Sequence, residues 1–184
     1  MLHRSTNLRL PPYSSLKQYE GKGNYAIWKY YNLPYSLFYC KKLKMIVSLM
    51  SEGNIYHNIL DYGSGPGIFE EELKRYAIAV KKLEIGEVID PRWRFDAIVC
   101  ASVLEFVDLK ITLILLKNLL KPGGKLYVGS PMQSVLSRTY FKFIGDKNKR
   151  IHHMKIISEI SKQFRIEKYT TWMSLYFAIR ASKN

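Results

Sequence analysis

The sequence predicts a single α/β domain built on a mostly parallel sheet, and three observations lead to this fold class. The chain has 184 residues, of which 47% are hydrophobic, so it is long and apolar enough to form one packed core. Short apolar runs that are typical of buried strands alternate with segments of helical periodicity. The first of these runs ends in a glycine-rich turn that leads into a helix, as expected for a strand of a parallel sheet.

The order of the elements follows from periodicity and from turn residues. The first twenty residues look irregular because they contain two adjacent prolines. Residues from about 25 to 50 show helical spacing that is interrupted at Pro34, which predicts one short helix and one longer helix. The remaining strands are expected at 56–63, 77–84, 95–103, 125–131, 164–172 and 174–182, and the helices at 67–76, 109–120 and 152–164.

The formal net charge of +14 is unevenly distributed along the chain. Residues 1–54 carry 8 Lys and Arg against 2 Asp and Glu, and residues 109–184 carry 15 against 3. Residues 55–108 are acidic instead, with 6 basic and 10 acidic side chains. The basic flanks would attract an anionic partner such as nucleic acid, a phosphorylated metabolite or a membrane surface, although basic surfaces also simply keep proteins soluble.

Cysteine usage and hydropathy predict a cytoplasmic protein. Cys40 and Cys100 are far apart and have no metal-binding spacing, which is typical of a reducing compartment without disulfides. The N-terminus has no apolar segment of a secretory signal, and no uncharged apolar stretch approaches the roughly 18 residues of a membrane span. The four histidines have no metal spacing, so no metal site is expected.

The glycine-rich turn, "ILDYGSGPGIF" at residues 59–69, is the most informative motif. Gly63, Gly65 and Gly67 recur at every second position, and Asp61 precedes the first of them. Missing Cβ atoms let the backbone approach a ligand, and the following helix offers free N–H groups, so the turn predicts a nucleotide site. Ile68 stands where a dinucleotide-binding fingerprint would place its last glycine, which argues against a dehydrogenase.

This turn resembles motif I, D-x-G-x-G-x-G, of the class I S-adenosylmethionine-dependent methyltransferases. Residues 95–107 and 115–131 are similar to the fourth strand, the next turn and the fifth strand of that family, in the same order. The resemblance covers about residues 55–184. It implies a Rossmann-like three-layer sandwich with an antiparallel final strand, in a single domain whose residues 1–54 form a helical substrate cap and whose residues 55–184 bind the cofactor.

The chain departs from the family between Glu84 and Phe95, where only ten residues replace a helix and a strand. We therefore expect the sheet to lack one strand and one helix of the family core. The adenine would be more exposed, or would be covered by Trp93 or a partner chain, and the open edge would invite a homodimer. Asp90 would contact the adenine amino group, or it is a turn residue before Pro91.

The resemblance also implies roles for individual residues. The glycine loop would lie against the methionine and ribose parts of S-adenosylmethionine, Asp61 would order the loop, and Glu84 would accept hydrogen bonds from the ribose hydroxyls. Three residues after the fourth family strand would line the methionine side near the reactive sulfur. The predicted cofactor-binding residues are Asp61, Gly63, Ser64, Gly65, Gly67, Glu84, Asp90, Cys100, Ala101 and Ser102.

The sequence does not require a catalytic base, because the cofactor supplies the reactive methyl group and the protein supplies alignment. His152 and His153 are the candidates for a base or an anion ligand, and a helix-capping or surface role is the alternative for both. The basic segment 138–155 is interleaved with aromatic residues. It would suit a nucleic-acid strand, an anionic lipid surface or a packed substrate lid with a solvated outer face.

We therefore predict a methyltransferase that uses S-adenosylmethionine and acts on an unidentified acceptor. An anionic acceptor fits the basic flanks, and small molecules, lipids and nucleic acids all remain open. The alternative is a non-catalytic basic protein that binds nucleic acid and retains only the fold.

Overall fold

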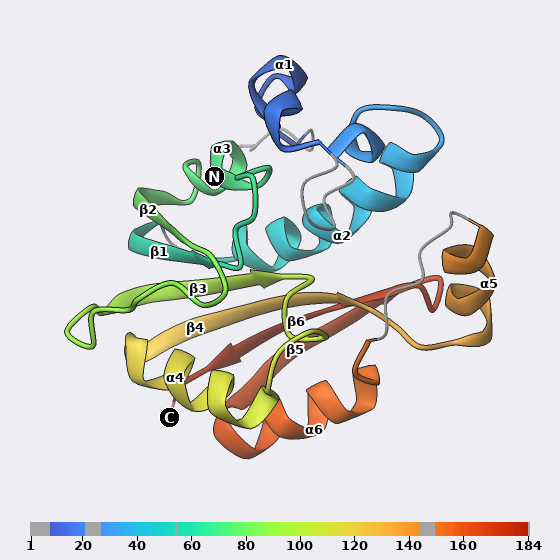
Figure 1. Cartoon of the computed structure of the whole chain (residues 1–184). Helices are drawn as coiled ribbons and strands as arrows, with labels where there is room; N and C mark the ends of the chain where they lie inside the picture. Colours follow the sequence, from blue (N-terminus) through green and yellow to red (C-terminus); the bar gives the residue numbers. More distant parts are fainter. Residues whose placement is uncertain (1–7, 21–26, 54, 144–149, 184) are drawn as a thin grey trace.

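The protein is a six-stranded sheet with helices on both faces (Figure 1). The computed structural model describes residues 8–20, 27–53, 55–143 and 150–183. The strands lie in the order β2-β1-β3-β4-β6-β5. Their bounds are β1 Tyr56–Tyr62, β2 Ala77–Leu83, β3 Phe95–Ala101, β4 Leu120–Pro131, β5 Arg165–Trp172 and β6 Tyr176–Ser182.

The strand directions confirm the predicted fold class. β1 pairs in parallel with both β2 and β3, and β3 pairs in parallel with β4. Only β6 runs against its neighbours β4 and β5, so the final strand is antiparallel. β2 lies at one edge, and residues 84–94 after it contain neither helix nor strand. The predicted loss of one strand and one helix is therefore confirmed.

The helices cover the two faces of the sheet separately. In Figure 1, α4 and α6 lie below the sheet, while α1, α2 and α3 lie above it. Two 3₁₀ helices, η1 Lys17–Tyr19 and η2 Ile27–Tyr30, precede α2. The α-helices are α1 Tyr13–Leu16, α2 Tyr35–Met50, α3 Glu70–Leu73, α4 Leu109–Leu119, α5 Val135–Phe143 and α6 His153–Gln163.

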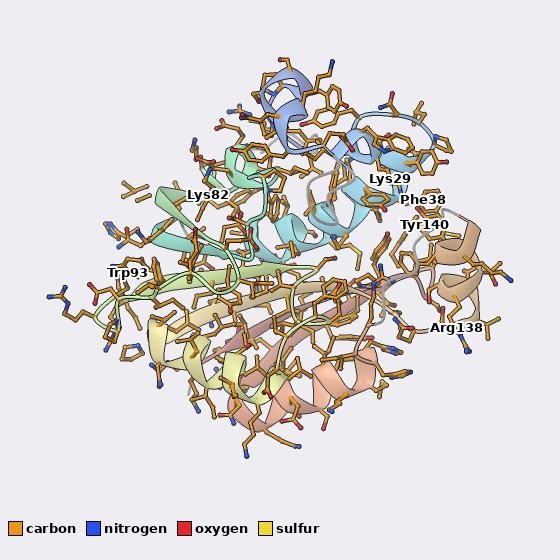
Figure 2. The ribbon with its side chains drawn as sticks, in the orientation of Figure 1. Lys29, Phe38, Lys82, Trp93, Arg138 and Tyr140 are labelled. Carbon is orange, nitrogen blue, oxygen red and sulfur yellow. The ribbon has the colours of Figure 1, made fainter. Side chains whose placement is uncertain are left out.

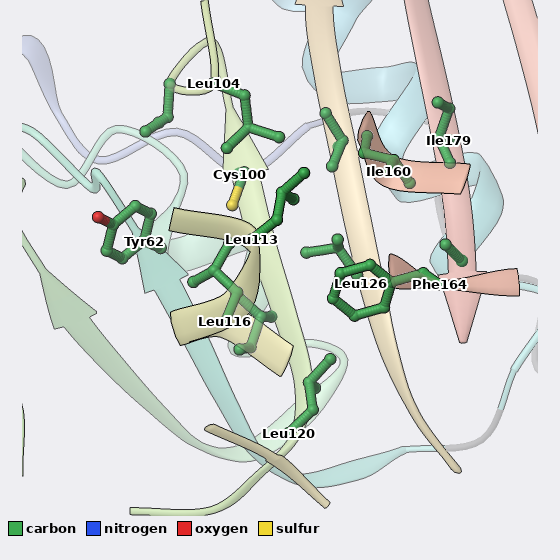
Figure 3. Packing of buried hydrophobic residues seen from close by; sticks show 14 of the residues in the cluster. Tyr62, Cys100, Leu104, Leu113, Leu116, Leu120, Leu126, Ile160, Phe164 and Ile179 are labelled. Atoms are coloured by element: carbon green, nitrogen blue, oxygen red, sulfur yellow. The ribbon is translucent and has the colours of Figure 1, made fainter. Parts of the chain in front are cut away.

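Each face of the sheet carries its own buried apolar cluster. The lower cluster joins α4 and α6 to the sheet through residues such as Leu113, Leu116 and Ile160 (Figure 3). The upper cluster includes Ile46 and Leu49 of α2, which are almost fully buried. Burial of a large aliphatic side chain stabilises a fold by about 1.5–3 kcal/mol, so α2 is held to the sheet by several such contacts.

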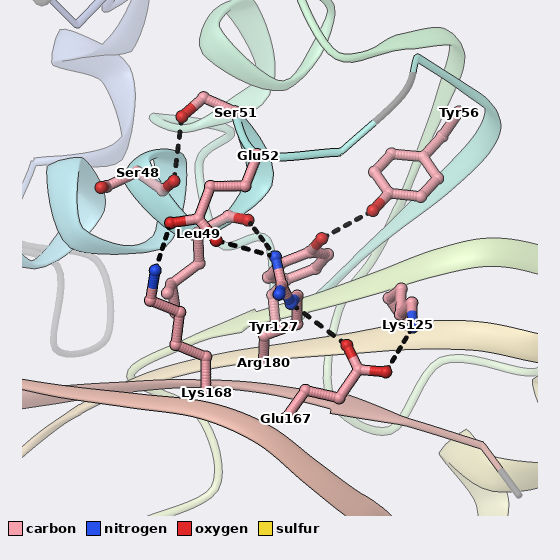
Figure 4. Close-up of polar contacts among 10 residues, drawn as sticks. All are labelled: Ser48, Leu49, Ser51, Glu52, Tyr56, Lys125, Tyr127, Glu167, Lys168 and Arg180. Atoms are coloured by element: carbon pink, nitrogen blue, oxygen red, sulfur yellow. Dashed lines mark hydrogen bonds and ion pairs between the residues drawn. The ribbon is translucent and has the colours of Figure 1, made fainter.

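Charged side chains also join the end of α2 to the far edge of the sheet (Figure 4). Glu52, just after α2, accepts hydrogen bonds from Lys168 of β5 and from Arg180 of β6. Glu167 accepts from Lys125 and forms an ion pair with Arg180. The contacts of Glu52 connect segments more than 100 residues apart, and they hold the end of α2 over β5 and β6.

Three local predictions were wrong. The helix expected at 67–76 is reduced to the single turn α3, because Gly67 has a left-handed φ of +80° and the residues around it form turns. The first twenty residues are not irregular throughout, since α1 and η1 lie within them. The helix α5 was missed, because its segment was interpreted only as a basic stretch interleaved with aromatic residues.

Within the described residues, no helix is both long and apolar enough to cross a membrane. The same residues contain no cluster of three or more His, Cys, Asp or Glu side chains that would hold a metal ion.

Candidate functional site

A cavity of about 410 Å³ opens where β1 and β3 end and β6 begins. This volume is within the range of pockets that bind small molecules. We name its two sides by their charges. The acidic half contains Asp61, the loop residues 63–66 and Glu84, whereas the basic half contains Lys42 and Arg150 among aromatic side chains. The two halves meet at Ser102 and Val103 in the segment that follows β3.

The glycine loop is held against the segment after β3. Gly63 has a φ of +69°, and a Cβ atom there would lie 2.4 Å from Cγ2 of Val103. Val103 is buried and β-branched, so it has little freedom to move aside. Gly63 and Gly65 line the cavity with Ser64, as predicted for a loop that approaches a ligand. Gly67 faces away, toward Lys82.

Asp61 is a buried carboxylate at the base of the acidic half. Its side chain is 2% exposed, and Oδ2 has no hydrogen-bond partner among the described residues. The pKa of Asp61 is raised to about 7, mainly by burial and also by the nearby charges of Glu70 and Glu84, against the opposing charge of Lys82. A buried carboxylate with an unused oxygen is suited to a cationic ligand group, which would satisfy both the charge and the hydrogen bond.

Glu84 follows β2 directly and lines the cavity beside the loop, as predicted. Its Oε1 accepts a hydrogen bond from the amide of Ile85, and the side chain is half-buried. Asp90 is not part of the cavity wall. Its carboxylate accepts hydrogen bonds from the amide and the guanidinium of Arg92, so the turn interpretation describes its position. Trp93 packs against Phe95 under the ammonium of Lys81, outside the cavity wall.

The three residues predicted at the end of β3 separate in the structure. Ala101 and Ser102 line the cavity, and Ser102 has a left-handed φ of +62° while its amide donates to the carbonyl of Gly129. Cys100 does not line the cavity, which corrects the prediction for this residue. Side chains alternate between the faces of a strand, so Cys100 lies in the lower apolar cluster, fully buried (Figure 3).

The basic half contains an unusual group of buried charges. Lys42 of α2 is 6% exposed, and its Nζ lies 2.5 Å from Oγ of Ser102. Glu105 is 2% exposed and accepts a hydrogen bond from Ser130 through Oε2, while Oε1 has no partner among the described residues. Arg150, which is half-buried, completes the group, and its guanidinium lies 4.5 Å from the centre of the Phe141 ring. Buried charges in a cavity are a common feature of functional sites.

Burial shifts the pKa values in this half toward the neutral forms. Desolvation lowers the pKa of Lys42 to about 8, with Arg150 lowering it and Glu105 and Cys40 raising it. Desolvation likewise raises the pKa of Glu105, against the charges of Lys42 and Arg150. Tyr30, also in the wall, has a raised pKa because it is buried. The basic half therefore contains ionisable groups whose protonation would change when a charged ligand binds beside them.

His152 and His153 are not in the cavity wall, which corrects their candidacy as catalytic residues. His152 caps α6, since its Nδ1 accepts a hydrogen bond from the amide of Met154. His153 is buried and accepts a hydrogen bond at Nδ1 from the amide of Gln133. Both histidines have structural partners, so the capping interpretation describes their geometry.

The segment 138–155 lies partly outside the described residues, at 144–149. In its described part, Tyr140 lies beside Phe38 of α2 (Figure 2), and the two ring centroids are 4.6 Å apart. Phe141 is buried beside Tyr176. Both rings pack against other parts of the protein, whereas Arg138 is exposed (Figure 2). The described part therefore has the arrangement of a packed lid with a solvated outer face.

Sequence reasoning missed Lys42, Glu105 and Arg150. A signal for Lys42 was present, because Lys42 lies three, four and seven residues before Met45, Ile46 and Leu49, on the apolar face of α2. A lysine at a core-facing position differs from the exposed Lys44 of the same helix. Glu105 and Arg150 gave no such signal, since their burial depends on contacts between distant segments.

Comparisons with known proteins agree with this geometry. A family model described as a methyltransferase domain matches residues 35–165. The N-methyltransferase NodS from Bradyrhizobium japonicum WM9, solved in complex with S-adenosyl-L-homocysteine, is 18% identical, with a TM-score of 0.63 over 93% of this chain and 97% of that chain. A Thermotoga maritima protein described as an S-adenosylmethionine-dependent methyltransferase, possible histamine N-methyltransferase, is 17% identical, with a TM-score of 0.57 over 80% and 89%. No curated protein matches the chain.

Proposed function

The chain belongs to the methyltransferase-domain family, and from this premise we propose that it transfers a methyl group from S-adenosylmethionine to a small anionic acceptor. The observation that carries this proposal is the divided cavity. Its acidic half suits a cationic cofactor, and its basic half suits an acceptor of negative charge. Both halves open into one space, so a donor and an acceptor would meet there.

Several features of the acidic half match the chemical groups of S-adenosylmethionine. The unused Oδ2 of Asp61 would accept a hydrogen bond from the amino group of the methionine part. Gly63 and Gly65 bring the loop backbone to the cavity wall, and Glu84 in the same wall would hold the ribose hydroxyls. When bound, the cofactor supplies an electrophilic methyl group, and the protein supplies alignment.

The adenine end of this half is open, because no helix or strand follows β2 before β3. Ile85 lines the cavity there and is 45% exposed. The adenine would therefore be partly exposed to solvent, which would lower affinity rather than change the identity of the ligand. The exposed edge of β2 would also suit a second copy of the chain, so we keep a homodimer as part of the proposal.

The basic half would orient the acceptor. The guanidinium of Arg150 would bind a carboxylate or phosphate group, because guanidinium groups pair well with planar oxyanions. Tyr30 and Tyr39 from residues 1–54, together with Tyr176 of β6, provide apolar walls for the rest of the acceptor. This placement supports a role for residues 1–54 as a substrate cap. Closure of the cap around both ligands would exclude water from the reaction.

Calorimetric titration with S-adenosylmethionine and S-adenosylhomocysteine tests the cofactor. We expect micromolar binding to the wild-type protein and no heat with nicotinamide nucleotides. Trial acceptors then test the other half, with 3-hydroxybenzoate and 3-aminobenzoate compared with their uncharged amides. We expect release of S-adenosylhomocysteine with the carboxylates, and a loss of at least 10-fold in Arg150→Met.

Two outcomes would contradict the proposal. The absence of heat with either cofactor, from a folded sample, would favour the alternative of a non-catalytic nucleic-acid-binding protein, and binding to a DNA or RNA oligonucleotide with a steep salt dependence would support that alternative. Turnover of the amides as efficiently as the carboxylates would instead show that the acceptor is not selected by its negative charge.

A further inference from the structure

Lys42 occupies the position where the two halves of the cavity meet. Its Nζ lies 2.5 Å from Oγ of Ser102, and Ser102 is followed by Val103, which contacts the glycine loop at Gly63. Lys42, Ser102 and Gly63 all line the same cavity. An acceptor held by Arg150 and a donor held by the glycine loop would therefore approach each other beside this amine.

Among the described residues, the amine of Lys42 forms no close ion pair. The hydrogen bond of its amine goes to a hydroxyl, while the carboxylate of Glu105 is engaged with Ser130. The groups that face Lys42 are Glu105 and Arg150 from two loops, Cys40 from its own helix, and the neutral rings of Tyr30 and Tyr176 in the cavity wall. A buried lysine without a close counter-charge favours its neutral, proton-accepting form.

The backbone of Ser102 is itself in a rarely populated conformation. Its φ of +62° is left-handed, although serine has a Cβ atom. The amide of Ser102 donates to the carbonyl of Gly129 at 2.7 Å, which fixes this conformation and directs the hydroxyl toward Lys42. Such strain concentrates at functional sites, where the surrounding structure holds it in place.

Building on the proposed function, we propose that Lys42 is the general base of the reaction and that Ser102 positions its amine. The acceptor would then be a hydroxyl or amino group that carries a dissociable proton. Its O–H or N–H bond breaks as the proton moves to the Lys42 nitrogen. The freed electron pair forms the new bond to the methyl carbon, and the methyl–sulfur bond breaks with its electrons remaining on sulfur. Lys42 later returns its proton to solvent.

The lowered pKa of Lys42 supports this role, because a base works best when its pKa is near the pH of the reaction. The two histidine candidates, His152 and His153, both lie outside the cavity wall. Lys42→Met retains a linear apolar side chain in a buried position, so this variant is expected to fold. Lys44→Met, an exposed change on the same helix, is the matched control.

The first test follows the ionisation of Lys42 by NMR, with ¹³C- and ¹⁵N-labelled lysine in the protein saturated with S-adenosylhomocysteine. The signal of Lys42 is identified by its absence in Lys42→Met. We expect its titration midpoint near 8, well below the value of about 10.4 for a lysine in a model peptide. A midpoint of about 10 or above would overturn the proposal, whatever the activity of the protein.

The second test uses methyl transfer to 3-hydroxybenzoate between pH 6 and 10. We expect kcat to rise with pH through the pKa of Lys42, and Lys42→Met to lower kcat at least 100-fold and to abolish this dependence. Lys42→Arg should not restore activity, because arginine stays protonated. Wild-type activity in Lys42→Arg would show that only the positive charge matters. Calorimetry distinguishes a failure of this proposal from a failure of the proposed function, because only the proposed function is contradicted when the wild-type protein does not bind the cofactor.

Discussion

The acidic and basic halves of the cavity are built in opposite ways. Asp61, the glycine loop and Glu84 lie within 24 residues of sequence, at the ends of two adjacent parallel strands. Lys42 and Arg150 are more than 100 residues apart, on a helix and in a loop. Each half nevertheless buries a charge that the protein does not fully compensate, since Asp61 has a raised pKa and Lys42 a lowered one.

This difference shows how the two halves would share one reaction. The acidic half is made by one short stretch of sequence, so the same site can occur in any protein that contains this strand–turn–helix unit. Such a site suits a cofactor that many enzymes share. The basic half is assembled from distant segments, so a change in any one of these segments alters its shape and charge. Such a site suits an acceptor that differs from one enzyme to another. Uncompensated buried charges destabilise the empty protein, and a bound ligand of opposite charge would remove that cost.

The largest effect should come from forcing the glycine loop away from Val103 at Gly63. In Gly63→Ala the new Cβ would overlap Val103, and the left-handed φ of +69° would add strain. We expect a loss of at least about 3 kcal/mol of unfolding free energy in urea, and no detectable cofactor binding. Gly123→Ala is the control, because Gly123 has a similar φ of +70° but open space around it, so only about 1 kcal/mol should be lost. Equal losses in both variants would show that Gly63 is not closely packed.

A second prediction concerns the buried charge of Asp61. Because the folded protein raises the pKa of Asp61 to about 7, folding favours the protonated carboxyl group. The free energy of unfolding should therefore fall as pH rises from about 4 to 7. Asp61→Asn removes this dependence and should be more stable than the wild type at pH 8, by up to about 4 kcal/mol. Urea denaturation at several pH values measures the difference. A constant difference across this range would contradict the raised pKa.

Asp96 provides the opposite case as a control. Burial acts to raise the pKa of Asp96, but hydrogen bonds from Lys121 and from the amide of Asn58 outweigh it and lower the pKa. Its charge therefore stabilises the fold above the unfolded pKa, and this contribution is lost as pH falls. Asp96→Asn should be destabilising at pH 8, where Asp61→Asn is stabilising.

The third prediction concerns the affinity of the acidic half for the cofactor product. Glu84→Gln keeps the size of the side chain but removes the charge that would hold the ribose hydroxyls. We expect the Kd for S-adenosylhomocysteine to rise about 10- to 100-fold, since a hydrogen bond to a charged group contributes about 1.5–3 kcal/mol. Calorimetry measures this change, with the exposed Glu71→Gln as the control. Unchanged affinity in Glu84→Gln would remove Glu84 from the binding site.

The same contrast explains what the sequence predicted and what it did not. The sheet and the glycine loop followed from local patterns, whereas the missing strand and the place of Glu84 followed from the family resemblance, which relates both to strand ends. The prediction for Cys100 was wrong because side chains alternate along β3, and this alternation directs Cys100 to the lower cluster. Lys42 and Arg150 come together only through the packing of α2 and the loop before α6, and no local pattern encodes that distance.

The smallest predicted effect lies at the open end of the acidic half. The ammonium of Lys81 is 3.9 Å from the centre of the Trp93 ring, and Trp93 also packs against Phe95, so the indole is held beside β2 (Figure 2). Lys81→Met removes the charge and should cost about 0.5–1 kcal/mol of unfolding free energy. The exposed Lys110→Met is the control and should change stability by less than about 0.5 kcal/mol. We expect both variants to bind S-adenosylhomocysteine with wild-type affinity, because Trp93 does not line the cavity. Weaker binding in Lys81→Met alone would instead show that Trp93 covers the adenine, and that the edge of β2 belongs to the acidic half.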